Sequence, residues 1–140
     1  MNVRDVMTSN PRTVSPNDGI QVAARIMKEE DTGVVPIVDN GRAVGVVTDR
    51  DIVIRAIADG GQPNKPVREI CSQDLVCATP DMSTREATKI MSERQVRRLP
   101  VVEGDRLVGI VSIGDIAVKE GKDSRTGETL EQISEGVKKH

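Results

Sequence analysis

Two short stretches, GVVTDRDI and GIVSIGDI, carry the side chains with the clearest chemical potential. Each places an aspartate three residues after a hydroxyl side chain, pairing Thr48 with Asp51 and Ser112 with Asp115. A carboxylate where a strand turns into a helix can accept two hydrogen bonds from a vicinal diol, as in folds that hold a ribose. The adjoining helix start offers N–H groups to an anion. Both stretches are therefore candidates for sugar and phosphate recognition.

A structural alternative explains the same spacing. We call residues 48–51 the first corner and residues 112–115 the second corner. A hydroxyl residue followed three positions later by an acid is a capping box, and such a cap contributes about 1 kcal/mol to stability. The cap does not account for the glycine and proline repeated before each corner. Because glycine inside a strand often marks close approach of another backbone or of a ligand, we expect such an approach at Gly45 and Gly109, which follow Pro36 and Pro100.

Basic residues distinguish the two corners. Arg97 and Arg98 are the only adjacent arginines in the chain, and they precede a β-branched run. The equivalent positions before the first corner are Gly33 and Val34. The two arginines are either a solvated basic edge or a phosphate clamp, since guanidinium matches phosphate with two parallel hydrogen bonds. Arg50 adds a charge to the first corner alone. We therefore expect two sites that differ in charge.

An internal repeat positions these residues. A shift of 64 aligns residues 3–55 with residues 67–119 without a gap, and 15 of the 53 pairs are identical. Each copy predicts the order strand, helix, strand, strand, helix, in an α/β (α+β) fold. The two copies share a core because a unit of about 60 residues buries little surface by itself.

Local signals set the expected element ends. Extended pieces at residues 12–14 and 75–78 lead to hydroxyl N-caps followed by proline, at Ser15–Pro16 and Thr79–Pro80. Tight turns are expected at Asn40–Gly41 and Gly104–Asp105. The first long helix should bury Ile20, Ala23, Ala24 and Met27, and the second Ala87, Ile90 and Met91. A helix from Thr48 carrying Ile52, Ile54, Arg55 and Ile57 should end at Gly60–Gly61.

The repeat also predicts the domain organisation. Residues 1–62 form the first repeat and residues 63–121 the second. The link at residues 59–66 is rich in glycine, proline and asparagine and is too short to join independent domains. Residues 122–140 form a C-terminal tail with one short helix at its end.

Composition narrows the function classes. The net charge is −2 with both signs mixed, so direct binding to nucleic acid is disfavoured. No apolar run could span a bilayer and the start lacks the apolar stretch of a signal peptide, which predicts a cytoplasmic protein without membrane contact. Cys71, Cys77 and His140 make no zinc-site spacing, and no internal histidine, P-loop or nucleophile elbow is present. We expect neither an enzyme nor a metal site.

The duplicated pattern, clearest in VVPIVDNGRAVGVVTDRDI and RRLPVVEGDRLVGIVSIGDI, resembles the tandem CBS domain pair, also called the Bateman module. The resemblance covers about residues 1–120 and is closest to stand-alone CBS pairs of bacteria and archaea. It implies two repeats related by a pseudo-twofold axis, packed as one globular unit with two ligand clefts between them. It further implies a disc-like homodimer.

The resemblance also implies a ligand and its contacts. Ligands of the family are AMP, ADP, ATP, S-adenosylmethionine and related adenosine compounds, which act as regulatory ligands rather than required cofactors. The ribose acid falls on Asp51 and Asp115 and the hydroxyl on Thr48 and Ser112. Contacts to the base, through backbone and apolar atoms, fall on Val46 and Ile110, and phosphate contacts fall on Arg97 and Arg98.

Two interpretations of function follow. The first is a regulatory module that binds an adenosine compound and signals through a change of conformation or oligomeric state, with a separate regulated protein as one possible partner. The alternative is a ligand-independent scaffold for a protein partner, or one associated with RNA through Arg50, Arg97 and Arg98. The sequence leaves the ligand and the partner open.

Overall fold

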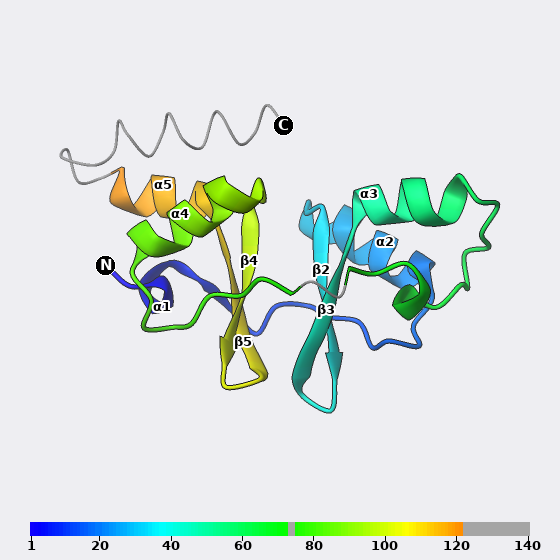
Figure 1. Ribbon diagram of the computed structural model, residues 1–140, viewed down its shortest axis with the longest axis horizontal. Helices are drawn as coiled ribbons and strands as arrows, with labels where there is room; N and C mark the ends of the chain where they lie inside the picture. Colours follow the sequence, from blue (N-terminus) through cyan, green and yellow to red (C-terminus); the bar gives the residue numbers. More distant parts are fainter. Residues whose placement is uncertain (73–74, 122–140) are drawn as a thin grey trace. The chain divides into compact units, whose positions relative to one another are not determined.

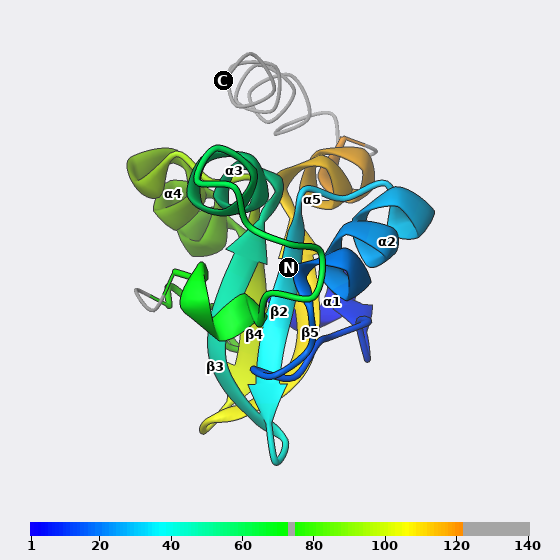
Figure 2. The same ribbon diagram turned by 90° about the vertical axis from the view of Figure 1, so that its right-hand side faces the viewer.

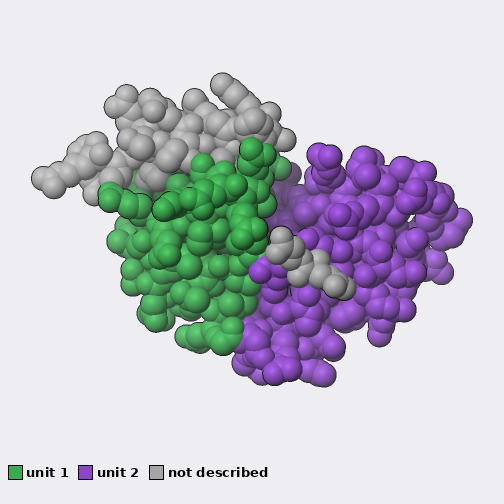
Figure 3. Space-filling model, in the orientation of Figure 1, with its two compact units in different colours: residues 1–11, 76–104, 108–140 green, residues 12–75, 105–107 purple. Residues whose placement is uncertain are grey.

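The computed structural model describes residues 1–72 and 75–121, which fold into two compact units of mixed helix and antiparallel sheet (Figures 1 and 3). The predicted tail helix within residues 122–140 lies outside the described residues. Unit 2 comprises residues 12–75 and 105–107, and unit 1 comprises residues 1–11, 76–104 and those from 108 onward. Each unit thus contains one hairpin and the helices that pack on it.

Each unit repeats one set of elements. Unit 2 contains α2 (Ile20–Glu30), β2 (Val34–Asp39), β3 (Arg42–Thr48), α3 (Asp49–Asp51), the π-helix η1 (Ile52–Ile57) and the 3₁₀ helix η2 (Val67–Glu69). Unit 1 contains α1 (Val3–Val6), β1 (Thr8–Ser9), α4 (Thr84–Arg94), β4 (Arg98–Glu103), α5 (Ile113–Glu120) and most of β5 (Arg106–Ser112). In both units the hairpin tip lies at one end and the corner into the following helix at the other (Figures 1 and 2).

The segments that open the repeats are exchanged between the units. Helix α1 belongs to the first repeat in sequence, yet the Val3 N–H donates to Met82 O at 2.8 Å in unit 1. Helix η2 belongs to the second repeat, yet the Val67 N–H donates to Asp18 O at 2.8 Å in unit 2. The compact units therefore differ from the sequence repeats in their boundaries.

The cores of the two units are aliphatic, as a chain without aromatic residues requires. In unit 2, α2 buries Ile20, Ala23, Ile26 and Met27, whereas Ala24, expected in the buried stripe, is exposed. In unit 1, α4 buries Ala87 and Met91 completely and leaves Ile90 half-buried. The buried stripes thus follow the helical period with a small rotation from the expected face.

The predicted helix starts are wrong by about four residues. Helix α2 is capped by Gly19, and α4 is capped by Ser83, whose hydroxyl accepts from the Glu86 N–H at 3.0 Å. Ser15 and Thr79 instead open tight turns, because their carbonyls accept from N–H groups three residues on. The prolines that follow them supply the fixed φ that favours the second position of such turns.

Of the other predicted elements, one turn is confirmed, and the short strands and the helix after Thr48 differ from the prediction. The Asn40–Gly41 turn is confirmed, with φ of 53° and 82°. The expected strands at residues 12–14 and 75–78 are reduced to single parallel bridges, Val14 to Ile37 and Ala78 to Val101. The helix expected from Thr48 to Gly60 is a turn of α-helix that widens into η1, where Ala56 is buried and Ile54 and Ile57 are 54% and 59% exposed.

Candidate functional site

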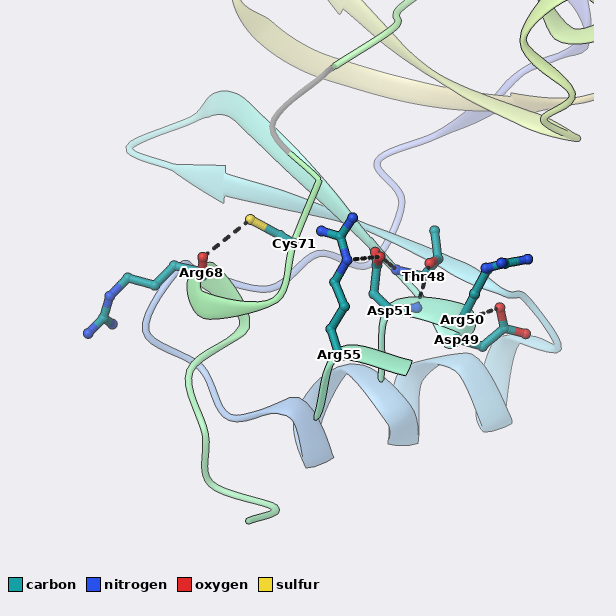
Figure 4. Close-up of polar contacts among 7 residues, drawn as sticks. All are labelled: Thr48, Asp49, Arg50, Asp51, Arg55, Arg68 and Cys71. Atoms are coloured by element: carbon teal, nitrogen blue, oxygen red, sulfur yellow. Dashed lines mark hydrogen bonds and ion pairs between the residues drawn. The ribbon is translucent and has the colours of Figure 1, made fainter. Parts of the chain in front are cut away.

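The first corner forms a complete capping box (Figure 4). Thr48 Oγ1 accepts from the Asp51 N–H at 3.0 Å, and Asp51 Oδ2 accepts from the Thr48 N–H at 2.9 Å. The other carboxylate oxygen, Oδ1, lies 3.7 Å from Arg55 Nε in an ion pair one helical turn along. Both oxygens of Asp51 therefore have partners within the protein, and its side chain is only 12% exposed.

The backbone N–H groups that open α3 are also occupied. The Asp49 N–H donates to Gly33 O at 2.9 Å, and the Arg50 N–H donates to Asp49 Oδ1 at 2.8 Å. The third N–H, that of Asp51, donates to Thr48 as described above. The anion contact expected from a free helix start is therefore not available at the first corner.

The second corner forms only half of this arrangement. Ser112 Oγ accepts from the Asp115 N–H at 3.0 Å, but the reverse bond from the Ser112 N–H to the carboxylate is not made. Asp115 is exposed, and its carboxylate has no hydrogen-bond or ion-pair partner within residues 1–72 and 75–121. The predicted capping box is thus complete in the first repeat alone.

The cations that follow the two aspartates differ in their partners. The 64-residue shift places Lys119 where the first repeat has Arg55. Lys119, near the end of α5, donates from Nζ to the backbone O of Asp5 in α1 at 2.8 Å. The lysine is thereby held on α1, away from the carboxylate that Arg55 pairs with in the first repeat.

The arginine pair lies at the second corner. Arg97 O accepts from the N–H of Ile113, the first residue of α5, at 2.9 Å. Arg98 begins β4, which pairs with β5. Neither guanidinium has a hydrogen-bond or ion-pair partner in the described part of the chain, and Arg97 is exposed while Arg98 is half-buried. The structure therefore places the backbone of Arg97 against the first residue of α5, and it places Arg98 on the strand that pairs with the one ending at Ser112.

Arg50 and the two predicted base-contact residues, Val46 and Ile110, differ in their exposure. Arg50 is exposed and lies on the opposite side of Asp51 from Arg55 in the view of Figure 4. Val46 and Ile110 are half-buried, so their side chains still offer apolar surface. The backbone of Val46, however, exchanges hydrogen bonds with Ser72 at 3.1 and 3.4 Å. The backbone N–H and O of Val46 therefore both have partners within the protein.

The repeated glycines have a structural cause. A Cβ on Gly45 would lie 2.9 Å from Ser72 O, and one on Gly109 would lie 2.8 Å from Thr8 O. Ile110 pairs with Thr8, as Val46 pairs with Ser72. Of the two expected approaches, a backbone or a ligand, the structure shows the backbone: each glycine admits the segment exchanged from the other repeat.

Cys71 lies beside the first corner (Figure 4). Its Sγ donates to Arg68 O at 3.6 Å. Burial raises the pKa of the Cys71 thiol, the hydrogen-bonded backbone lowers it, the charge of Asp51 raises it, and the charge of Arg55 lowers it. Cys71 therefore senses both members of the Asp51–Arg55 ion pair.

Sequence reasoning missed Arg55 and Lys119 as part of the corners. The available signal was the spacing of Asp51 and Arg55, four residues apart on a helix, which lets opposite charges meet. The same spacing relates Asp115 to Lys119, where the lysine has another partner. Only the contacts of the folded chain distinguish the two cases.

Within residues 1–72 and 75–121 no three or more His, Cys, Asp or Glu side chains gather in a way that could hold a metal ion. None of the helices in this part of the chain is long and apolar enough to cross a membrane.

Comparison with known proteins identifies the same two repeats. The model of the CBS domain family matches residues 3–57 and residues 67–119. The chain is 44% identical over 132 residues to the CBS domain-containing protein YhcV of Bacillus subtilis, covering 94% of each chain. The crystal structure of Hypoxic Response Protein I, which has two coordinated zinc ions, superposes with a TM-score of 0.78 at 38% identity, covering 84% of this chain and 98% of the other.

A further solved structure contains adenosine ligands. The CBS domain pair of protein MJ0100, in complex with 5-methylthioadenosine and S-adenosyl-L-methionine, superposes with a TM-score of 0.76 at 32% identity. The match covers 87% of this chain and 97% of that one. With both repeats matched by the family model and both corners at the same places in each repeat, the chain belongs to the CBS domain family and contains two CBS repeats.

Proposed function

We propose that the protein is a regulatory module that binds an adenosine-containing ligand such as AMP, ADP, ATP or S-adenosylmethionine. The observation that carries the proposal is the exposed carboxylate of Asp115, without a partner in the described residues, at the start of α5, whose Ile113 N–H donates to the backbone O of Arg97. The adenosine compounds bound to the CBS pair of MJ0100 support the ligand class. The proposed contacts are Thr48, Asp51, Ser112, Asp115, Val46, Ile110, Arg50, Arg97 and Arg98.

The chemistry of each contact follows from its groups. A carboxylate accepts hydrogen bonds from both hydroxyls of a ribose, and each of its oxygens has two acceptor sites. Guanidinium groups pair with phosphate through two parallel bonds. Aliphatic side chains such as Val46 and Ile110 can contact the faces of a purine in a chain that has no aromatic ring.

Binding would regulate by shifting populations. A ligand changes a conformational equilibrium only through its different affinity for the two states. We propose that the protein signals in this way without catalysing a reaction, through a homodimer or a separate partner protein. Exposed apolar side chains on η1, those of Val53, Ile54 and Ile57, provide a face on which a second copy can pack.

Calorimetric titration of the purified protein with AMP, ATP and S-adenosylmethionine tests the proposal. We expect binding of at least one of them, and we expect Asp115→Ala to weaken it at least tenfold because the ribose loses its acceptor. Asp39→Ala is the matched control, since Asp39 is an exposed aspartate at the end of β2. Absence of binding by all three compounds, or equal losses in the two variants, would contradict the proposal.

A further inference from the structure

We infer that the two corners take chemically different ligands. The second corner takes a phosphate-bearing adenosine compound, whereas the first corner suits an adenosine compound without phosphate, with which the protein's own Arg55 competes for Asp51. The inference rests on the proposed function and assigns a role to each corner. It follows from three differences between sites that the repeat makes equivalent in sequence.

The first difference is the state of the carboxylate. Asp51 accepts from the Thr48 N–H and pairs with Arg55 Nε, whereas Asp115 has neither kind of partner within the described residues. A diol that binds Asp51 must compete with the guanidinium for Oδ1. A diol that binds Asp115 meets no such competitor among the described residues.

The cause of this difference is the cation that follows each aspartate. Arg55 pairs with the acid four residues before it, while Lys119 is held by the backbone O of Asp5 at 2.8 Å. Because α1 is the segment exchanged into unit 1, the exchange itself removes the lysine from Asp115. The contact of Lys119 with α1 is therefore part of the fold of unit 1.

The second difference concerns N–H groups. All three that open α3 donate to protein acceptors, among them the carboxylate of Asp49. The second repeat has Ile113 where the first has Asp49, and in the described chain the Gly114 N–H has no partner. An N–H donor thus remains at the second corner alone, next to the arginine pair.

The third difference is charge. Counted over matched positions, the second corner combines Asp115 with Arg97, Arg98 and Lys119, for a formal charge of two positive units (3 − 1). At the first corner Asp49 and Asp51 offset Arg50 and Arg55, for a formal charge of zero (2 − 2).

Asp49 also lies where a phosphate contact would be needed. The residue equivalent to Arg97 is Gly33, and a Cβ there would be 3.1 Å from an oxygen of the Asp49 carboxylate. A phosphate at this place would meet a carboxylate instead of a guanidinium. Since like charges in contact disfavour binding, the first corner suits an adenosine compound without phosphate.

Titrations with AMP and adenosine, on the full chain and its variants, test this assignment. We expect one AMP to bind per chain. Asp115→Asn should weaken AMP at least tenfold, and Asp51→Asn at most twofold. The double variant Arg97→Gln, Arg98→Gln should weaken AMP but leave adenosine within twofold, because only AMP carries a phosphate.

Arg55→Gln tests the internal competitor, with Lys119→Gln as the matched control. The ion pair is exposed only on its Arg55 side and contributes about 1 kcal/mol, so we expect adenosine to bind the first corner about fivefold more tightly in Arg55→Gln. Lys119→Gln should leave that affinity unchanged. Thermal melting of each variant confirms that it is folded.

The outcomes separate the two proposals. Absence of AMP, ATP, adenosine and S-adenosylmethionine binding by the unaltered protein overturns the proposed function, and this inference with it. AMP binding that Asp51→Asn weakens as much as Asp115→Asn leaves the function standing and overturns the assignment of the corners. An adenosine affinity equal in Arg55→Gln and Lys119→Gln overturns the role of Arg55.

Discussion

At the scale of single residues, two aspartates at equivalent positions of the repeat have different surroundings. Asp51 and Asp115 occupy equivalent positions in the repeat, yet one is closed by a backbone N–H and a guanidinium and the other is exposed. Their difference arises from Arg55, which pairs with Asp51, and from Lys119, which donates to the backbone O of Asp5. The partner of a cation therefore decides which carboxylate is available to a ligand.

Cys71 reports on this ion pair. Its pKa is raised by burial and by Asp51 and lowered by Arg55, so Arg55→Gln should raise the pKa further and Asp51→Asn should lower it. Because the thiolate is the reactive form, alkylation of Cys71 at pH 8 should slow in the first variant and accelerate in the second. Mass spectrometry resolves the two cysteines in one sample.

Cys77 is the internal control, because burial alone raises its pKa. Its alkylation rate should be the same in both variants, and a parallel change at Cys77 would contradict the electrostatic explanation.

The raised pKa values of Cys71 and Cys77 affect the pH dependence of the free energy of unfolding in the same direction. Since the folded pKa of each thiol is raised, the stability they contribute is present below about pH 8.5, the value for a free thiol, and is lost as the pH rises through the folded pKa.

At the scale of elements, the exchanged segments explain the sequence pattern around the corners. Thr8 lies on Gly109 and Ile110, and Ser72 lies on Gly45 and Val46. The conspicuous glycines therefore serve the packing of backbone on backbone at the edge of each hairpin. A ligand is not needed to account for them.

Alanine substitutions test this explanation. Gly45→Ala and Gly109→Ala should each destabilise the protein by about 1–3 kcal/mol, because the new Cβ meets a backbone oxygen that cannot move freely. Gly114→Ala is the control, since its Cβ would meet nothing closer than Ser112 Oγ at 3.9 Å. Chemical denaturation gives the free energies of unfolding. A loss as large in Gly114→Ala would point to a general effect of replacing glycine.

At the scale of the whole molecule, the chain is organised by units that are not contiguous in sequence. Val3 and Val6 from the start of the chain are 0% and 4% exposed in the core of unit 1, among residues of the second repeat. Val67 and Ile70 have the same role in unit 2. Each repeat therefore depends on the other for part of its core.

The assembly of the protein is tested on η1. If a second copy covers this face, the double variant Ile54→Glu, Ile57→Glu should convert a dimer to a monomer while leaving the fold intact, because both side chains are more than half exposed. Val44→Glu, on an exposed valine of β3, is the control. Analytical ultracentrifugation measures the mass. A dimer that persists in the double variant, or a monomer before any substitution, would contradict the proposal.

The sequence by itself determined the family, the repeat, the hairpins and the corner residues, because these depend on local spacing and on residue types copied at a fixed shift. The hydroxyl of Thr48 accepts from the Asp51 N–H and that of Ser112 from the Asp115 N–H, each three residues along the chain. Helix starts were displaced because a hydroxyl before proline suits a turn as well as an N-cap.

Only the tertiary structure decided which of the equivalent groups remain free. The partners of Gly45, Gly109 and Lys119 lie 27, 101 and 114 residues away in the chain. Local propensity carries no information about contacts of such separation, whereas the exchange of α1 and η2 between the units creates them. The repeat thus produced two similar corners, and the folded chain made them unequal.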